Sequence, residues 1–273
     1  LRGIDFFRRS IALAEKYRRP GQQIQHTIQT NGTLIDDTWA AFFVQHGYLV
    51  GISLDGPEAL HDTYRVDKRG SGSFKDAVRG WRLLQKHGVE ANVLCTVHAG
   101  NASQPLDVYR FFRDELGARY IQIIPIVERA TSETIAVANQ GWAGPRGSDR
   151  PLYRQAGSLV TERSVAPEQF GRFLSEIFDE WIRRDVGTVF IITFDVALGS
   201  WLGQHNACIV SPACGGALVL EHNGDVYSCD HYVEPGYRLG NIERQPLGTL
   251  VNSEAQRRFG QAKFATLPRY CLE

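Results

Sequence analysis

Short apolar segments alternate with amphipathic helical patterns along most of this chain, and this alternation is the feature that most constrains its fold. Almost wholly apolar runs, typical of strands buried on both faces, are found at 48–53, 91–97 and 120–127. We expect further strands at 24–29 and 189–194, and helices at 6–18, 36–47, 73–88, 106–116 and 167–184. Strands that alternate with helices in this way predict an α/β fold with a parallel sheet or barrel.

Local signals predict where two of these helices begin and end. Asp36 is a favourable N-cap for the helix that closes at Gly47, because its side chain can accept a hydrogen bond from a free backbone N–H. Ser73 and Asp76 resemble a capping box at the start of the following helix. Gly88 is then expected to end that helix.

Polar loops follow four of the expected strands, at 29–33, 53–57, 98–101 and 128–129. In parallel α/β proteins the functional residues lie where strands end, because the strand bodies are buried. Each of these residues taken alone also fits a turn or a helix cap. Four such loops on one rim predict a ligand-binding mouth.

Four of the five cysteines lie in the last third of the chain, at Cys208, Cys214, Cys229 and Cys271. Between the second and the third, short apolar runs flank Asn223-Gly224, a strong signal for a two-residue β-hairpin turn. A hairpin there would make Cys214 and Cys229 neighbours. Gathered thiolates repel one another unless a cation or cluster neutralises them, so this pattern indicates metal, disulfide or redox chemistry.

Three kinds of site compete for these cysteines. Disulfides are disfavoured, because the number of cysteines is odd and the N-terminus has no basic segment followed by an apolar one. Structural zinc prefers two Cys-x2–4-Cys knuckles, which this segment lacks. The spacing therefore favours an iron–sulfur cluster and leaves zinc open.

Charge gives no reason to expect a nucleic-acid or membrane partner. Lys plus Arg and Asp plus Glu both number 30, and the pI is near 7.2. No apolar run approaches the roughly 20 residues that cross a bilayer, so we expect a soluble, cytoplasmic protein. The chain starts at Leu1 and contains no Met, so we also expect it to be a fragment of a longer protein.

Several motifs together resemble those of one enzyme superfamily. They are Gln29 to Trp39, Gly51 to Pro57 followed by Arg65, Cys214 to Cys229 with Asp-His-Tyr after it, and Tyr237 to Ile242. This combination is similar to radical S-adenosylmethionine enzymes that carry a SPASM auxiliary-cluster domain. Within that superfamily it most resembles the anaerobic sulfatase-maturating enzymes.

The resemblance implies a partial (β/α)6 TIM-like barrel at residues 1–200. A small, cysteine-rich SPASM domain with a β-hairpin would follow at residues 201–273. The family holds three [4Fe-4S] clusters, one for S-adenosylmethionine and two auxiliary. Its Cys-x3-Cys-x2-Cys loop would lie upstream of Leu1, so we expect the chain alone to be inactive.

The resemblance also implies roles for individual residues. S-adenosylmethionine would be held by four residues, Gln29, Asn31, Ser53 and Arg65. One auxiliary cluster would be bound by Cys208, Cys214 and Cys229, with a fourth ligand beyond residue 273, and Cys271 would belong to the other. Asp230 matches the base that takes the substrate's thiol or hydroxyl proton, and we expect a closed site to raise its pKa toward neutrality.

In that family a 5′-deoxyadenosyl radical oxidises a sulfatase Cys or Ser to Cα-formylglycine. The implied partners are a nascent sulfatase with a Cys-x-Pro-x-Arg or Ser-x-Pro-x-Arg motif and an electron donor such as flavodoxin or ferredoxin. Two alternatives stay open: a SPASM enzyme that crosslinks peptides through thioether or carbon–carbon bonds, and a binding protein with a zinc-bound hairpin.

Three further expectations concern residues outside this set. Cys95 lies inside an apolar strand and is expected to be a buried small hydrophobe. His222 and His231 are expected to be surface residues rather than iron ligands. The stretch from Ala130 to Ala166 is long for a connection without secondary structure, and we expect it to grip the substrate peptide.

Overall fold

A computed structural model describes residues 3–141, 155–204 and 207–269 of the chain. The chain divides into two compact units, Leu1–Phe194 and Asp195–Glu273. The domain boundary expected at residue 200 stays a prediction. Within the described ranges, no helix combines the length and the apolar character needed to cross a membrane.

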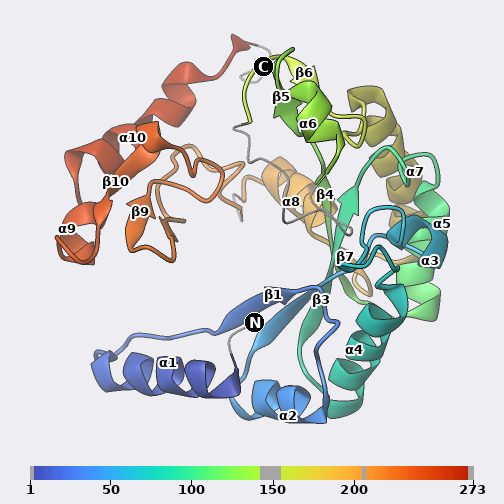
Figure 1. The fold of residues 1–273 in the computed structure, drawn as a ribbon, viewed down its shortest axis with the longest axis horizontal. Coiled ribbons are helices and arrows are strands. Elements are labelled where there is room, and N and C mark those ends of the chain that lie inside the picture. Colours follow the sequence, from blue (N-terminus) through green and yellow to red (C-terminus); the bar gives the residue numbers. More distant parts are fainter. Residues whose placement is uncertain (1–2, 142–154, 205–206, 270–273) are drawn as a thin grey trace. The chain divides into compact units, whose positions relative to one another are not determined.

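The first unit is built on a parallel five-stranded sheet with the order β1-β2-β3-β4-β7 (Figure 1). Its strands are β1 (Thr27–Thr30), β2 (Leu49–Ser53), β3 (Ala91–Val97), β4 (Tyr120–Pro125) and β7 (Phe190–Ile191). Every pairing in this sheet is parallel, which confirms the α/β prediction. Sequence neighbours are also sheet neighbours from β1 to β4, so their carboxyl ends form one edge.

The helices of this unit follow the strands in the predicted alternation. They are α1 (Ile4–Tyr17), α2 (Asp37–Gln45), α3 (Glu58–His61), α4 (Phe74–His87), α5 (Pro105–Arg110) with a π-helical turn (Phe111–Glu115), α6 (Ile135–Asn139) and α7 (Pro167–Arg184). In Figure 1 α2, α4, α5 and α7 lie along one side of the sheet. Asp36 caps α2 as predicted, since its carboxylate accepts a hydrogen bond from Trp39 N at 2.9 Å.

The core lies between the sheet and these helices. Val50, Val93 and Cys95 are fully buried on the strands, which confirms the prediction for the Cys95 thiol. Trp81 of α4 and Trp181 of α7 pack into the same cluster, and each indole N–H donates to a backbone carbonyl. Because this face of the sheet is filled by helices, the opposite face and the strand ends remain for ligands.

The stretch from 130 to 166 contains secondary structure, contrary to the expectation of a structureless connection. The short antiparallel pair β5 (Arg129–Ala130) and β6 (Leu159–Val160) closes it, and α6 lies between them. Arg163 holds the two ends of this stretch together, because its Nε and Nη2 donate to Glu128 Oε2 at 3.0 and 2.6 Å. Residues 142–154 of this stretch lie outside the described residues.

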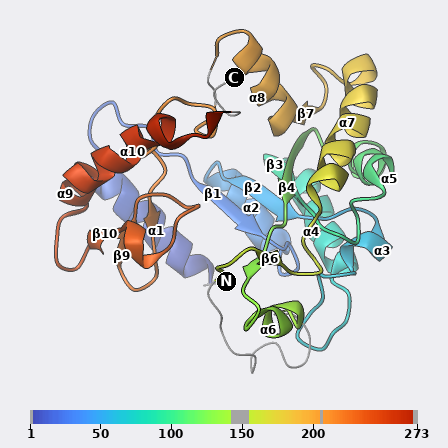
Figure 2. The same cartoon turned by 90° about the horizontal axis from the view of Figure 1, so that it is seen from above.

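The second unit is a three-stranded antiparallel sheet with helices. Its elements are β8 (Val219–Leu220), β9 (Asp225–Tyr227), a 3-10 turn (Pro235–Tyr237), β10 (Arg238–Asn241), α9 (Leu247–Val251) and α10 (Glu254–Thr266). α8 (Ile192–Trp201) joins the two units in sequence. Figures 1 and 2 both show α10 beside β9 and β10.

Two local predictions differ from the structure. Ser73 does not cap α4 with its side chain; instead Asp62 Oδ1 accepts from Phe74 N at 2.9 Å, because Ser73 Oγ donates to the carbonyl of Arg65. The expected strand at 189–194 is only two residues long. From Ile192 the chain continues as a helix, since its apolar run fits a buried helix as well as a strand.

The hairpin between β8 and β9 is confirmed, but its turn differs from the predicted two-residue type. Gly224 N donates to the carbonyl of Glu221 at 2.9 Å, so His222 and Asn223 occupy the turn. Gly224 follows with φ of +85°, whereas no described non-glycine residue has a positive φ. This is the pattern of a type I turn with a glycine bulge, and it still brings the two strand ends together.

Candidate functional site

The carboxyl ends of β1 and β2 present two of the side chains predicted to hold S-adenosylmethionine. Gln29 lies beside Gly51 in the parallel register, and Ser53 is two residues further along β2. Side chains two residues apart on a strand share a face, so Gln29 and Ser53 point to the same side of the sheet. Gln29 is exposed and Ser53 is half-buried, so both can reach a ligand.

Arg65 is held over the end of β3 by an ion pair with Asp55. Its Nε donates to Asp55 Oδ2 at 2.5 Å, and its Nη2 donates to Asp55 Oδ1 at 3.0 Å and to Thr96 Oγ1 at 3.1 Å. The Asp55 side chain is 3% exposed and that of Arg65 is 26% exposed. None of these bonds uses Nη1, so an oriented guanidinium group keeps a donor for a carboxylate.

A second layer of polar residues holds the Asp55–Arg65 ion pair in place. Asn101 Nδ2 donates to the carbonyls of Asp55 and Thr96, at 2.9 and 3.0 Å. Asp55 N donates to His61 Nδ1 at 3.3 Å, which requires a neutral imidazole at that nitrogen. Burial lowers the pKa of His61 to about 4, and burial also lowers the pKa of His98. The layer therefore adds hydrogen bonds without adding positive charge.

Asn31 lies in the turn after β1, where it stabilises its own loop. Its Oδ1 accepts from Thr33 N at 3.3 Å and from Thr33 Oγ1 at 3.1 Å, while the residue itself is exposed. α4 packs against this turn so closely that a Cβ on Gly80 would collide with the backbone oxygen of Gly32. The turn is therefore rigidly supported, and the side-chain amide of Asn31 remains accessible.

In the second unit, Cys229 follows β9 and is flanked by Asp230 and His231. The Cys229 Sγ atom lies 3.3 Å from Asp230 Oδ1 and 3.7 Å from His231 Nδ1. The three potential ligand atoms lie within 4.8 Å of one another. His231 is 68% exposed and His222 is 92% exposed, which confirms their surface position. The contact between His231 and Cys229 was not predicted.

The structure does not bear out the expected rise in the pKa of Asp230. Burial acts to raise the pKa, but the bond from the Cys229 thiol and the nearby His231 outweigh it, so the pKa lies below its usual value. Burial is the largest single influence on this pKa, but the contacts with Cys229 and His231 together outweigh it, and the Asp230 side chain stays 60% exposed. A carboxylate in this state is ionised at neutral pH and can accept a proton.

The described cysteines of the second unit form no disulfide, and they differ in exposure. Cys208 is exposed, Cys214 is half-buried and Cys229 is buried. Burial above all raises the pKa of the Cys229 thiol, and the charges of Asp230 and Cys214 add to this effect. Cys271 lies outside the described residues.

The described thiols are not gathered around one point. Around one tetrahedral zinc, sulfur atoms lie about 4 Å apart, because each Zn–S bond is roughly 2.3 Å long. In the described part of the chain, the sulfur atoms of Cys208, Cys214 and Cys229 do not all come within 4.8 Å of one another. As the structure places them, these three cysteines therefore do not form the compact group that a single zinc ion needs.

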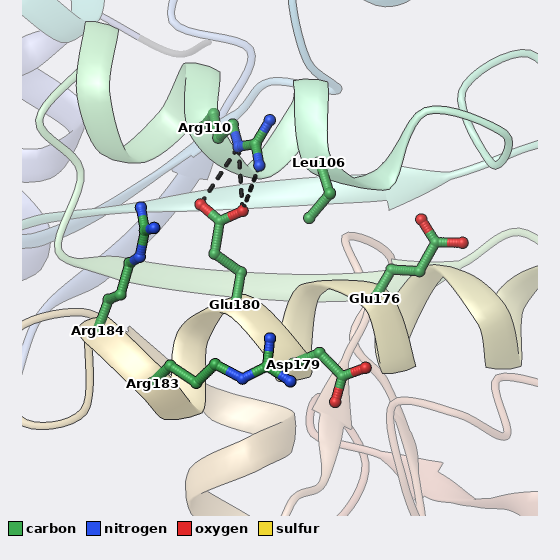
Figure 3. A pocket seen from close by; sticks show the side chains of 7 residues that line it. All are labelled: Leu106, Arg110, Glu176, Asp179, Glu180, Arg183 and Arg184. Carbon is green, nitrogen blue, oxygen red and sulfur yellow. Dashed lines mark hydrogen bonds and ion pairs between the residues drawn. The ribbon is translucent and has the colours of Figure 1, made fainter.

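A surface pocket between α5 and α7 contains none of the predicted site residues. Figure 3 shows its lining, which consists of Leu106, Arg110, Glu176, Asp179, Glu180, Arg183 and Arg184. Arg110 Nη2 pairs with Glu180 at 2.6 Å, as the dashed lines show. This pocket is therefore a groove between paired charges on the helical side of the sheet, away from the strand ends.

Sequence reasoning missed three residues of the site. Asp55 and Asn101 lay in the predicted polar loops but were given no role, and Thr96 lies inside a strand. The usable signal for Thr96 was a hydroxyl near the carboxyl end of a mostly apolar strand, at a half-buried position between two buried residues.

Comparison with known proteins identifies the same two parts. Residues 208–273 match SPASM, an iron-sulfur cluster-binding domain. A serine-type anaerobic sulfatase-maturating enzyme of Bacteroides thetaiotaomicron is 44% identical over 100% of the chain and 63% of its own length. A cysteine-type enzyme of Clostridium perfringens is 31% identical over 97% of the chain and 65% of its own length. The chain thus spans less than two thirds of these curated relatives.

A solved structure gives the same result in three dimensions. Native anSMEcpe with bound AdoMet and Cp18Cys peptide superposes with a TM-score of 0.81, at 30% identity over 99% of the chain and 69% of that structure. Together with the parallel sheet, this match confirms a partial radical S-adenosylmethionine barrel followed by a SPASM domain.

Proposed function

We propose, because the chain belongs to the family of anaerobic sulfatase-maturating enzymes, that the complete protein oxidises a sulfatase Ser or Cys to Cα-formylglycine. The observation that carries this proposal is the 44% identity to a named maturase along the whole chain. Two further serine-type relatives and one cysteine-type relative are all 34% identical to the chain, so the proposal covers both serine and cysteine as substrates.

S-adenosylmethionine is the first cofactor we propose. Gln29, Asn31 and Ser53 would contact it at the ends of the strands, and Arg65 would pair with its carboxylate. The Asp55 ion pair supports this role, since it fixes the guanidinium group and leaves Nη1 to donate. When bound to its own [4Fe-4S] cluster, this cofactor supplies the 5′-deoxyadenosyl radical that removes a substrate Cβ hydrogen.

Auxiliary [4Fe-4S] clusters are the second cofactor. Cys208, Cys214 and Cys229 would bind one of them, and Cys271 would bind the other. Cys229 is buried and Cys214 is half-buried, which supports the fit, because a metal centre neutralises the thiolates that burial would otherwise disfavour. Such a cluster can accept the electron that the substrate must still lose.

Asp230 would act as the general base in this reaction. Its carboxylate is exposed and ionised, and it directly follows the cluster ligand Cys229. It would take the hydroxyl proton of serine or the thiol proton of cysteine. Cys229, the preceding residue, would then hold the auxiliary cluster, as the electron acceptor, close to the substrate oxygen or sulfur that loses its proton.

We propose that the partners are a nascent sulfatase with a Cys-x-Pro-x-Arg or Ser-x-Pro-x-Arg motif and a flavodoxin or ferredoxin as electron donor, in the cytoplasm. The stretch 130–166 would grip the peptide beside the strand ends. Domain limits of 1–200 for the barrel and 201–273 for the SPASM domain also belong to this proposal.

Peptide conversion by the complete protein tests the function. The protein is reconstituted anaerobically with iron, sulfide, S-adenosylmethionine and a reductant, and is incubated with paired peptides that differ only in Ser or Cys. Mass spectrometry should detect an aldehyde in place of the side chain. Formation of 5′-deoxyadenosine with both peptides unmodified would contradict the maturase assignment and favour another peptide-modifying reaction.

A further inference from the structure

We propose that one face of α10, formed by Gln256, Gly260 and Lys263, positions all three described cluster cysteines. This inference rests on the proposed assignment of Cys208, Cys214 and Cys229 as cluster ligands. None of the three α10 residues contributes a ligand; each holds backbone next to a cysteine. We call them the positioning face.

The positioning face follows from helical spacing. Residues 256, 260 and 263 are separated by four and three positions, so they lie above one another on the same side of a helix. Gln256 and Gly260 are buried and Lys263 is half-buried, whereas the neighbours at 257, 258, 261 and 262 are exposed. α10 therefore turns one narrow side toward the cysteine-bearing loops.

Gln256 connects the segments that carry Cys214 and Cys229. Its Nε2 donates to the carbonyl of Gly215 at 3.0 Å and to the carbonyl of Ser228 at 3.1 Å. Gly215 follows Cys214, and Ser228 precedes Cys229, so one carboxamide sets the distance between the two cysteines.

The same carboxamide leaves one atom unsatisfied. Gln256 is 4% exposed, and its Oε1 is buried without a hydrogen-bond partner in the described part of the chain. A buried acceptor without a partner is destabilising, so an apolar side chain here would relieve that cost. A buried glutamine with an unpaired Oε1 therefore indicates a role for the two N–H donors of its Nε2.

Gly260 lets α10 approach the Cys214 backbone directly. Cys214 N donates to the carbonyl of Gly260 at 3.1 Å. A Cβ on Gly260 would lie 2.5 Å from the Cys214 carbonyl oxygen and 3.3 Å from its carbon. Any side chain at residue 260 must therefore move the Cys214 backbone away from the helix.

Lys263 holds the third cysteine. Its Nζ donates to the carbonyls of Cys208 and Ile209, at 2.5 and 2.9 Å. Cys208 is exposed, and these two bonds tie the backbone of its loop to α10.

Iron retention by the complete protein tests this inference. Gln256→Leu and Gly260→Ala should each speed chelator-driven loss of one cluster's iron by about tenfold, the lower end of the effect seen for residues that orient metal ligands. The electron paramagnetic resonance signal of that cluster should change as well. Gln261→Leu, on the exposed side of α10, and Gly248→Ala, whose Cβ meets nothing within 4 Å, are the matched controls and should leave both readouts unchanged.

Lys263→Met provides a variant whose half-buried side chain can be changed without opening the core. It should also speed iron loss, and Lys263→Arg should restore retention, because a guanidinium group can donate to both carbonyls. This pair decides the matter if the other two variants fail to fold.

Cys229→Ser separates this inference from the proposed function. If Cys229→Ser loses one cluster's iron while the α10 variants keep wild-type retention and spectra, the positioning face is refuted and the ligand assignment stands. If Cys229→Ser keeps all its iron, the ligand assignment falls and the inference about α10 falls with it.

Discussion

Replacement of Asp55 by asparagine tests the support of Arg65 most sharply. The variant keeps the shape of the side chain, and its amide oxygen can still accept from Thr96 N and from Arg65 Nη2, now at 2.9 and 3.0 Å. Its amide nitrogen must then face Arg65 Nε, which is now 2.5 Å from Oδ2, so two donors meet. The change removes the partner of a charge whose side chain is only 26% exposed.

The cost can be estimated from these contacts. Loss of one partner in a buried, hydrogen-bonded ion pair costs about 3–5 kcal/mol, and the partial exposure of Arg65 places this case at the lower end. We therefore expect Asp55→Asn to lower the free energy of unfolding by about 3 kcal/mol. The control Asp76→Asn weakens an ion pair in which Asp76 is 63% exposed, and it should cost no more than about 0.5 kcal/mol.

Urea unfolding followed by circular dichroism and tryptophan fluorescence measures both variants. In the complete protein, Asp55→Asn should also weaken the binding of S-adenosylmethionine. If the Arg65 guanidinium group of the variant is correctly oriented only a tenth of the time, the Kd rises about tenfold. An Asp55→Asn variant as stable as Asp76→Asn, with an unchanged Kd, would refute the reasoning.

Further predictions concern His61, beside this ion pair, and the packing of two helix glycines. The folded chain holds the pKa of His61 at about 4, while the pKa in the unfolded chain is about 6.5. Between those pH values the unfolded state binds more protons than the folded state. The free energy of unfolding therefore falls as the pH falls. From about pH 7 to about pH 5 the wild type should lose about 2 kcal/mol more than His61→Gln in urea unfolding, and equal losses would contradict this. Gly80→Ala should destabilise the chain by about 1–3 kcal/mol, because its Cβ would collide with the Gly32 oxygen. Gly171→Ala, in α7 with nothing within 4 Å, should stabilise it by about 0.5–1 kcal/mol, and thermal unfolding that gives both variants the same sign would be evidence against the packing.

The sequence predicts most of the barrel because its strands and helices are long and strongly patterned. The bounds of β3 and α7 agree with the structure to the residue, and Asp36 caps α2 as expected. Short elements fail for a physical reason: the run from 189 to 194 is apolar in either conformation, and only tertiary packing makes Ile192 the start of a helix.

Contacts between segments far apart in the chain could not be predicted. Asp62 caps α4 from twelve residues away, and Gln256 reaches carbonyls of residues 215 and 228. No periodicity encodes such contacts, because they depend on how loops fold back. The lowered pKa of Asp230 likewise depends on its contacts with the Cys229 thiol and His231, which spacing alone does not reveal.

We propose that Asp230 takes the substrate proton during formylglycine formation. The most direct measurement counts 5′-deoxyadenosine and peptide aldehyde by mass spectrometry, for the complete wild-type protein, Asp230→Asn and the exposed control Glu234→Gln. We predict that Asp230→Asn still forms 5′-deoxyadenosine but makes aldehyde at least about 100-fold more slowly, while Glu234→Gln behaves like the wild type. Aldehyde formation by Asp230→Asn at the wild-type rate would contradict the claim.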